Sequence, residues 1–190
     1  MLKGQLPINV LFICILFSFS EVFADSMLSD VNKKKAGVIY NLSKFIDWPN
    51  EVFSSETFNI CLTGEVVFLD AMKNFEKRQI RGRAVRVHAL NNILNNVKKL
   101  SNCQTLYINS SKKQVLPNIL ALLDKKSILT ISDSPSFSLQ GGMIELTQVK
   151  KRVQFAINLD AAKSVDLLIS AQLLRLAKTV KYKNSQIDNP

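Results

Sequence analysis

The sequence predicts a single α/β domain with a mostly parallel central sheet, flanking helices and a C-terminal antiparallel hairpin added to the sheet. The chain has 190 residues and 47% hydrophobic content, enough for one domain with a sizeable core. Its short β-rich runs alternate with helical patterns, which is typical of a parallel sheet. Two further β-rich runs are then separated only by Lys150-Lys151, which predicts the hairpin.

Residues 1–24 are typical of a secretory signal peptide. Lys3 supplies a positive start, residues 6–19 are apolar, and Val22-Phe23-Ala24 offers a small-residue cleavage site. We therefore expect cleavage before Asp25 and export of the mature chain. The alternative is a permanent membrane anchor, but the apolar run is shorter than the roughly 18 residues that a membrane helix needs.

The first half of the mature chain alternates helices with strands. Apolar residues three, four and seven positions apart predict an amphipathic helix over residues 31–47, before Trp48-Pro49. A strand over 58–62 ends at Thr63-Gly64 and precedes a second helical pattern from Val66 to Phe75. The later elements expected in this half are a strand at 85–90, a helix at 93–100, a strand at 105–109, a helix at 114–123 and a strand at 127–131.

The second half begins with the hairpin, whose strands are expected at 143–149 and 152–158. Helices at 159–164 and 171–182 then complete a domain over residues 25–182. The tail over 183–190 is polar, and we expect it to be frayed.

Two cysteines remain after removal of the signal peptide, because Cys14 lies within it. Cys61 and Cys103 are then an even number in an oxidising compartment, which favours a disulfide that closes a loop of about 43 residues. The alternative is two buried free thiols, since each cysteine lies in or next to an apolar run.

The formal net charge of +10 raises the question of an acidic partner. The basic residues are scattered in pairs without interleaved aromatic side chains, and an exported protein meets no genome, so we expect no nucleic acid partner. Solvated faces and loop ends account for most of this charge, and weak attraction to anionic lipid or an acidic partner is the alternative.

Catalytic and metal-binding patterns are scarce. One His, three Cys and no clustered acidic residues leave little for a metal centre or a triad, so we expect no enzyme activity, metal or cofactor. His88 stands alone in an alternating strand, and a hydrolase would need a nucleophile paired with it. Asp133 follows a strand at the presumed carboxyl edge of the sheet, where a capping or turn role is expected. Gly64 and Gly141-Gly142 lack the nucleotide-binding motifs.

Three aromatic residues near the end of the first helix are candidates for contact with a protein partner. Tyr40, Phe45 and Trp48 are spaced so that some ring surface can remain outside the core, and Tyr and Trp are favoured at interfaces. The alternative is that these rings seat the first helix on the sheet.

Several stretches, taken in order, resemble the YfiR-like family of bacterial periplasmic proteins. They cover nearly all of the mature chain, and their ordered combination carries the resemblance. The stretches are residues 35–49, 58–64, 79–83, 102–108, 129–133, 141–144, 153–158 and 170–177.

The resemblance implies regulation by binding, without catalytic residues. It implies repression of an inner-membrane diguanylate cyclase through its periplasmic region, which lowers cyclic di-GMP, and relief by an outer-membrane lipoprotein. It also implies a homodimer and a disulfide between Cys61 and Cys103. A second disulfide found in the family has no counterpart, because no Cys follows Cys103. The alternative function is a periplasmic small-ligand-binding module at the carboxyl edge of the sheet.

Overall fold

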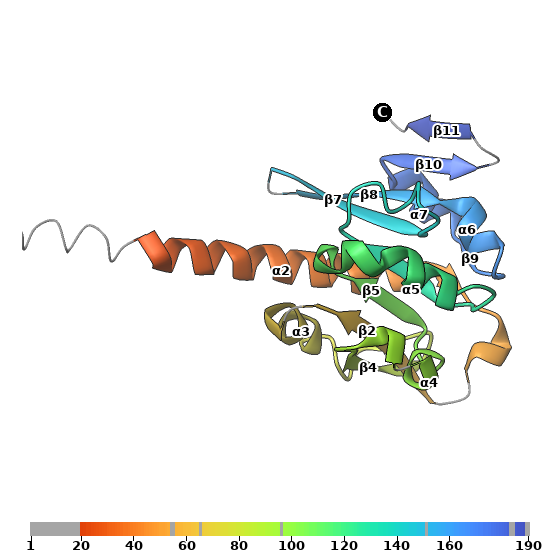
Figure 1. Cartoon of the computed structure of the whole chain (residues 1–190), viewed down its shortest axis with the longest axis horizontal. Helices are drawn as coiled ribbons and strands as arrows, with labels where there is room; N and C mark the ends of the chain where they lie inside the picture. The colour runs from red at the N-terminus through yellow and green to blue at the C-terminus, as the bar shows by residue number, and fades with distance from the viewer. Residues whose placement is uncertain are drawn as a thin grey trace, which may run out of the picture.

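The computed structural model describes residues 20–53, 56–64, 66–95, 97–150, 152–182 and 185–188. The predicted signal peptide therefore lies outside the described residues, except for positions 20–24. In this structure of the uncleaved chain those five residues belong to the first described helix, α2 (Ser20–Lys44). Figure 1 shows the N-terminal part of α2 projecting beyond the sheet.

The described strands form one large sheet with the order β11-β10-β8-β7-β6-β5-β2-β4-β3. Five of its pairs are parallel, and β3–β4, β7–β8 and β10–β11 are antiparallel, so the predicted fold class is confirmed. The strands are β2 (Thr57–Thr63), β3 (Gln79–Ile80), β4 (Arg83–Ala89), β5 (Thr105–Ile108), β6 (Leu129–Ser132), β7 (Ile144–Val149), β8 (Arg152–Asn158), β10 (Thr179–Tyr182) and β11 (Ser185–Asp188).

Most of the expected elements are present close to their predicted positions. The strand of β2, the hairpin of β7 and β8, and the helices after β2 and β8 are confirmed. The described helices besides α2 are α3 (Val66–Lys73), α4 (Val97–Leu100), α5 (Leu116–Leu122), α6 (Leu159–Lys163) and α7 (Ala171–Leu176), with 3₁₀ turns η1 (Asn50–Val52), η2 (Ile93–Asn95) and η3 (Ser110–Val115).

Alternation along the central strands divides the core into two layers. In β5, Tyr107 belongs to the cluster beneath α2 and α3, whereas its neighbours Leu106 and Ile108 belong to the cluster beneath α4 and α5. Successive strand side chains point to opposite faces, so one buried strand supplies both layers. A wholly buried strand such as β5 is therefore expected at the middle of a sheet that helices cover on both faces.

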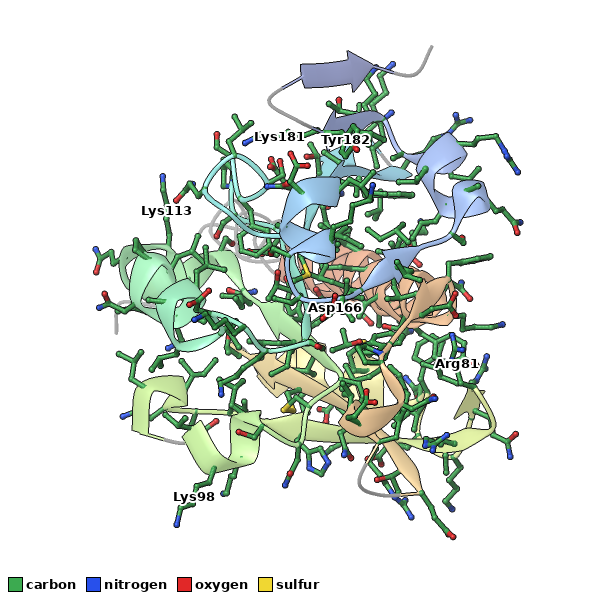
Figure 2. The ribbon with its side chains drawn as sticks, turned by 90° about the vertical axis from the view of Figure 1, so that its right-hand side faces the viewer. Arg81, Lys98, Lys113, Asp166, Lys181 and Tyr182 are labelled. Carbon is green, nitrogen blue, oxygen red and sulfur yellow. A yellow bond between two sulfur atoms is a disulfide. The ribbon has the colours of Figure 1, made fainter. Side chains whose placement is uncertain are left out.

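The sheet's two ends carry different kinds of strand. Figure 2 shows Lys181 and Tyr182 at the end formed by β10 and β11, and Arg81 toward the opposite end, where β3 is the last strand. The β3 edge has two residues only. A very short edge strand offers few unpaired backbone groups to another chain.

Helix α2 begins earlier and ends earlier than the predicted 31–47 segment. No Gly or Pro interrupts residues 20–36, so nothing in the sequence stops the helix from starting at Ser20. At its other end the chain turns after Lys44, and Ile46–Asp47 becomes the short strand β1. This strand pairs antiparallel with β9 (Leu168–Ile169), a partner over a hundred residues away that local periodicity does not report.

The predicted helix over 171–182 is wrong in its second half. Helix α7 ends at Leu176, Ala177 is extended, and the Lys178 amide donates to the Phe155 carbonyl at 2.8 Å. Residues 179–182 then form β10 parallel to β8. The β-branched pair Thr179-Val180 suits this strand. The tail expected to fray also contains a strand, since β11 pairs antiparallel with β10.

Two glycines hold places that a larger residue would disturb. Gly64, with φ of +115°, follows β2, and a Cβ there would lie 2.5 Å from Cβ of Asn109. A Cβ at Gly142 would lie 2.1 Å from the Phe137 ring, which is fully buried. The Gly141-Gly142 pair therefore serves a tight turn against an aromatic ring, in agreement with the turn role favoured by the sequence.

Candidate functional site

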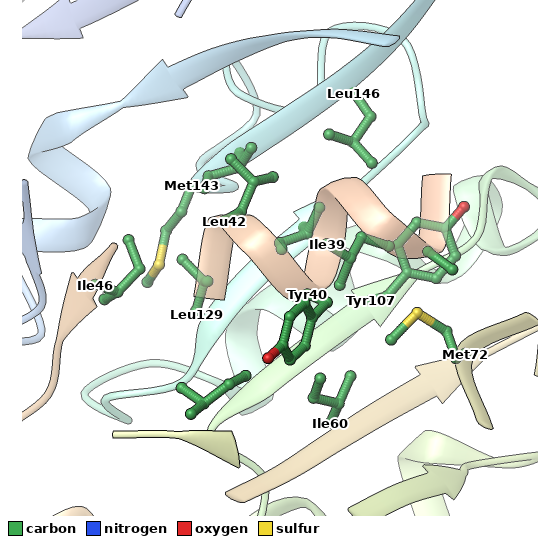
Figure 3. Packing of buried hydrophobic residues seen from close by; sticks show 14 of the residues in the cluster. Ile39, Tyr40, Leu42, Ile46, Ile60, Met72, Tyr107, Leu129, Met143 and Leu146 are labelled. Carbon is green, nitrogen blue, oxygen red and sulfur yellow. The ribbon is translucent and has the colours of Figure 1, made fainter. Parts of the chain in front are cut away.

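The three aromatic residues selected from the sequence lie mainly in the core. Figure 3 shows Tyr40 among the side chains that α2 places against the sheet. Tyr40 is 8% exposed and Trp48 is 5% exposed, whereas Phe45 is half-buried. The Tyr40 hydroxyl donates to the Gln79 carbonyl at 3.1 Å, and Trp48 Nε1 donates to the Gln104 carbonyl at 3.2 Å. These rings thus pack the C-terminal end of α2 and β1 against the sheet.

Cationic side chains cover the aromatic residues of this region. The Arg78 guanidinium lies 4.9 Å from the Phe75 ring centre, and Phe75 stacks on Tyr40 at 4.9 Å. Lys44 Nζ lies 5.7 Å from the Tyr40 ring centre. Cations placed over ring faces are attracted by the ring quadrupole. The outermost groups above these rings are therefore positive charges carried on aromatic supports.

A second aromatic group continues the same surface. Trp48 packs edge-on against Phe58 at 5.1 Å and near Phe53 at 6.4 Å, and the Arg83 guanidinium lies 4.2 Å above the Phe53 ring. Next to it, Arg81 donates to the Ile46 carbonyl at 3.0 Å and pairs with Asp47. We call the surface formed by these rings, by Lys44, Arg78 and Arg83 over them, and by the neighbouring Arg81 the cation–aromatic surface.

The distribution of charged residues along the sequence indicates this surface, although the adjacent Lys-Lys pairs do not. Residues 77–123 include nine Lys or Arg and no Asp or Glu. This stretch supplies β3 and β4 at one end of the sheet, together with α4 and β5. Of its charges, Arg81 pairs with Asp47. Counting charges over a whole βα segment, in place of adjacent pairs, would have found this surface.

A second group of polar side chains lies at the carboxyl edge of the sheet, where Asp133 was expected. Lys35 Nζ on α2 lies 2.5 Å from Asp133 Oδ2 and 3.4 Å from the Tyr107 hydroxyl, and the Ser110 amide donates to Asp133 Oδ1 at 2.8 Å. Lys35 also lies over the Phe68 ring at 5.7 Å. The structure thus gives Asp133 an ion pair that links α2 to the sheet, in addition to its role in the loop.

The pKa of Asp133 is lowered by this surrounding. Burial alone would raise the pKa, but the hydrogen bond and positive charge of Lys35 outweigh it, helped by hydrogen bonds from Tyr107 and the Ser110 amide. Asp133 is therefore ionised at neutral pH and pairs with Lys35. The ion pair of Lys35 and Asp133 therefore links α2 to the edge of the sheet.

The Asp133 group does not assemble a nucleophile with a base. The neighbouring Ser134 hydroxyl is buried without a hydrogen-bond partner, so it is not paired with Lys35. A cavity of about 320 Å³ beside Lys35 and Asp133 is lined also by Glu145, but this carboxylate already accepts hydrogen bonds from the Ser136 and Ser138 amides.

His88 and the cysteines lie together on the other face of the sheet. Cys61 and Cys103 form a disulfide with a Cα–Cα distance of 5.8 Å, which is the pairing favoured by the sequence. His88 is exposed in β4, and its Nε2 lies 3.0 Å from Asn59 Oδ1. It is thus a satisfied surface residue that no described carboxylate orients.

Within the described ranges, no three His, Cys, Asp or Glu side chains gather closely enough to hold a metal ion. None of the described helices combines the length and apolar character needed to cross a bilayer.

Comparison with known proteins gives a family and a related fold. The family model described as YfiR/HmsC-like matches residues 32–178. A conserved domain protein from Vibrio cholerae O1 biovar El Tor strain N16961 has a similar structure, with a TM-score of 0.53 and 12% sequence identity. The similarity covers 65% of this chain and 54% of that protein, so the chain matches about half of its length. No curated protein sequence matches.

The fold is a disulfide-bonded α/β domain. The family match covers most of the chain, and the chain belongs to the YfiR/HmsC-like family. This family is a regulatory one, known for periplasmic regulators of diguanylate cyclases. The disulfide agrees with an oxidising compartment.

Proposed function

We propose that this protein is a periplasmic repressor that binds the periplasmic region of an inner-membrane diguanylate cyclase and lowers cyclic di-GMP. The observation that carries the proposal is the family match over residues 32–178, which includes the sheet from β2 to β8 and both disulfide cysteines. Residues 1–24 act as a signal peptide that is cleaved before Asp25.

Repression requires a difference in affinity. A soluble partner can shift the cyclase only if it binds the inactive conformation more tightly than the active one. The repressor itself needs no catalytic group for this task, because the difference in its binding free energy between the two conformations shifts the cyclase toward the inactive one. An outer-membrane lipoprotein would relieve repression by competing with the cyclase for the repressor. We also propose that the repressor acts as a homodimer.

The cation–aromatic surface is the docking site that we propose for the cyclase. Arg78 and Lys44 are exposed and rest on ring faces, which limits their conformational freedom before binding. Tyr40 and Trp48 act beneath them as supports, and half-buried Phe45 supplies apolar contact at the rim. A surface of this charge fits an acidic patch on the partner.

The first test measures intracellular cyclic di-GMP in the host with the gene present, deleted, and restored with or without residues 1–24. We expect deletion to raise cyclic di-GMP and only the form that carries the signal peptide to reverse the rise. Unchanged levels in all strains, with the protein present in the periplasm of the parent, would rule out the repressor function.

A second test addresses the docking surface. The Arg78→Glu variant should be exported and folded yet fail to restore repression, because it places a negative charge opposite an acidic partner. Lys113→Glu is the matched control, since Lys113 is also exposed and lies away from Arg81 in Figure 2. Equal repression by both variants would place docking elsewhere, while the deletion experiment would still decide the function.

A further inference from the structure

A cavity of about 570 Å³ lies beside the disulfide, on the face of the sheet opposite α2. Its size falls in the range of small-molecule sites. Its floor is the polar side of β2, its far wall is the end of β4, and α4 with the turn after it closes the third side. The lining residues are Thr57, Asn59, Cys61, Val87, His88, Ala89, Leu90, Lys99 and Asn102.

Hydrogen bonds fix the polar floor of this cavity. Asn59 Nδ2 donates to the Asn102 carbonyl at 2.9 Å, so Asn59 Oδ1 must be the atom that faces Thr57 and His88. An oxygen in that place accepts, so His88 Nε2 carries a hydrogen and Nδ1 is the ring's remaining polar atom. Asn59 is 8% exposed, and its network sets the imidazole before any ligand arrives.

The charge of the lining has one sign. Lys99 brings a positive charge, and no lining residue is acidic. The segment that supplies β4 and α4 brings no acidic residue, because residues 77–123 contain no Asp or Glu. Arg86, which is exposed, is paired in register with Asn59 on the neighbouring strand. An anion entering the cavity therefore meets the Lys99 ammonium and no lining carboxylate.

The remaining walls are apolar and aliphatic. Leu90, just past the end of β4, and the disulfide through Cys61 form the apolar wall, and both belong to the core cluster on this face of the sheet. The Val87 side chain packs into the cluster on the α2 face, so β4 meets the cavity at Val87 through its backbone. Leu90 is held in place by its amide, which donates to the Leu62 carbonyl at 2.8 Å. Such a wall favours a hydrocarbon body over a second polar group.

We propose that this cavity binds a small carboxylate with a short aliphatic body. The carboxylate pairs with the Lys99 ammonium, and the body lies against Leu90 and the disulfide. The proposal goes beyond the repressor function and does not depend on it, because it concerns a different face and a different kind of partner.

The test uses three probes with the oxidised, exported protein purified from the periplasm. Hexanoate has the charge and the body, hexylammonium has the same body with the opposite charge, and acetate has the charge without the body. Binding is followed by ¹H–¹⁵N NMR, with the side-chain amides of Asn59 and Asn102 as reporters. We expect hexanoate to shift these signals at the lowest concentration, acetate to act only at higher concentration, and hexylammonium to leave them unchanged.

A pair of lysine variants locates the charge. Lys99→Gln should weaken hexanoate binding about three- to five-fold, as expected for one partly exposed ion pair. Lys98→Gln is the control, because Lys98 is exposed, does not line the cavity and points away from the body of the protein in Figure 2. Both variants change exposed positions, and an unchanged unfolding temperature verifies that each retains the fold.

Three results would overturn the proposal. The first is equal binding of hexanoate and hexylammonium, the second is equal weakening by Lys99→Gln and Lys98→Gln, and the third is the absence of any shift at Asn59 and Asn102 with hexanoate. Each result is independent of cyclic di-GMP, so failure here leaves the repressor proposal intact.

Discussion

One ion pair joins the first helix to the carboxyl edge of the sheet. The side chains of Lys35 and Asp133 are 16% and 18% exposed, so both charges lie largely out of water. Removal of one partner then leaves the other without its counter-charge in a poorly solvated place, which costs more than loss of a surface pair.

We expect Asp133→Asn to lower the free energy of unfolding by about 2–3 kcal/mol at pH 7. The pKa of Asp133 is lowered in the folded state, so its stabilising effect is complete above the ordinary Asp pKa of 3.8. The effect is lost as the pH falls further, through the lowered pKa. Urea unfolding of both proteins at pH 7 and near pH 3 should therefore show the difference shrinking in acid.

Asp70→Asn is the control for this ion-pair prediction. Asp70 and Lys73 are 3.8 Å apart with side chains 69% and 52% exposed, so the change should stay within about 0.5 kcal/mol. A loss for Asp133→Asn that is no larger than this would contradict the structural role of the ion pair.

Two glycines should respond to alanine with opposite signs. Gly37 lies inside α2, where an added Cβ meets only the Phe75 ring at 3.8 Å, so Gly37→Ala should stabilise the protein by about 0.5–1 kcal/mol. Gly142→Ala drives a methyl group into the buried Phe137 ring and should destabilise by about 1–3 kcal/mol. Thermal unfolding of the two variants checks both signs, and a stable Gly142→Ala protein would contradict this packing.

At the scale of elements, the sequence predicts what local pattern can encode. Strand β2 and the β7–β8 hairpin follow from β-rich runs with turn residues between them, and the structure has them. Strands β1 and β10 were expected as helix because each depends on a partner distant in sequence. Backbone pairing with β9 and β8 outweighs the helical spacing of the apolar side chains there.

The features of the candidate site also separate into those that the sequence predicts and those that depend on contacts between distant elements. The position of Asp133 at the sheet edge and the pairing of Cys61 with Cys103 could be expected from strand order and compartment. The pairing of Asp133 with Lys35 could not, because 98 residues separate them and only the path of α2 brings them together. The burial of Tyr40 and Trp48 likewise depends on packing between distant elements.

The disulfide joins β2 to the residues that lead into β5, two strands that are neighbours in the sheet. The two cysteines are 42 positions apart in the sequence, and for a loop of this length the chain-entropy model gives a stabilisation of about 4 kcal/mol as an upper value. The double variant Cys61→Ser/Cys103→Ser should therefore unfold at lower urea concentration, and a reducing agent should move only the parent protein toward it. An unchanged midpoint would mean that the bridge adds no stability.

Thiol counting tests the disulfide together with signal-peptide cleavage. Alkylation and mass measurement of the periplasmic protein should detect no free thiol before reduction and two after it. An uncleaved chain would retain Cys14 and show one free thiol before reduction, while a chain without the bridge would show at least two.

The whole molecule combines a net charge of +10 with an uneven distribution of that charge. The absence of acidic residues over 77–123 concentrates positive potential on the side of β3 and β4. Such a field speeds the encounter with an acidic partner and is screened by salt.

Capture of the cyclase's periplasmic region should therefore depend on salt. We expect the association rate to fall about ten-fold or more between low and physiological ionic strength, with a smaller change in the dissociation rate. Arg78→Glu should flatten this dependence and Lys113→Glu should preserve more of it. Surface plasmon resonance at several salt concentrations measures both, and a rate that is independent of salt would contradict electrostatic docking.

The disulfide also turns residues 61–103 into a covalently closed ring that contains β4, α4 and most of the cavity lining. A protease that cuts once inside this ring severs the chain without releasing either fragment, because the two pieces stay linked through sulfur. Damage of this kind would become visible on a gel only after reduction. In a compartment rich in proteases, the bridge thus lets a nicked molecule keep both of its parts together.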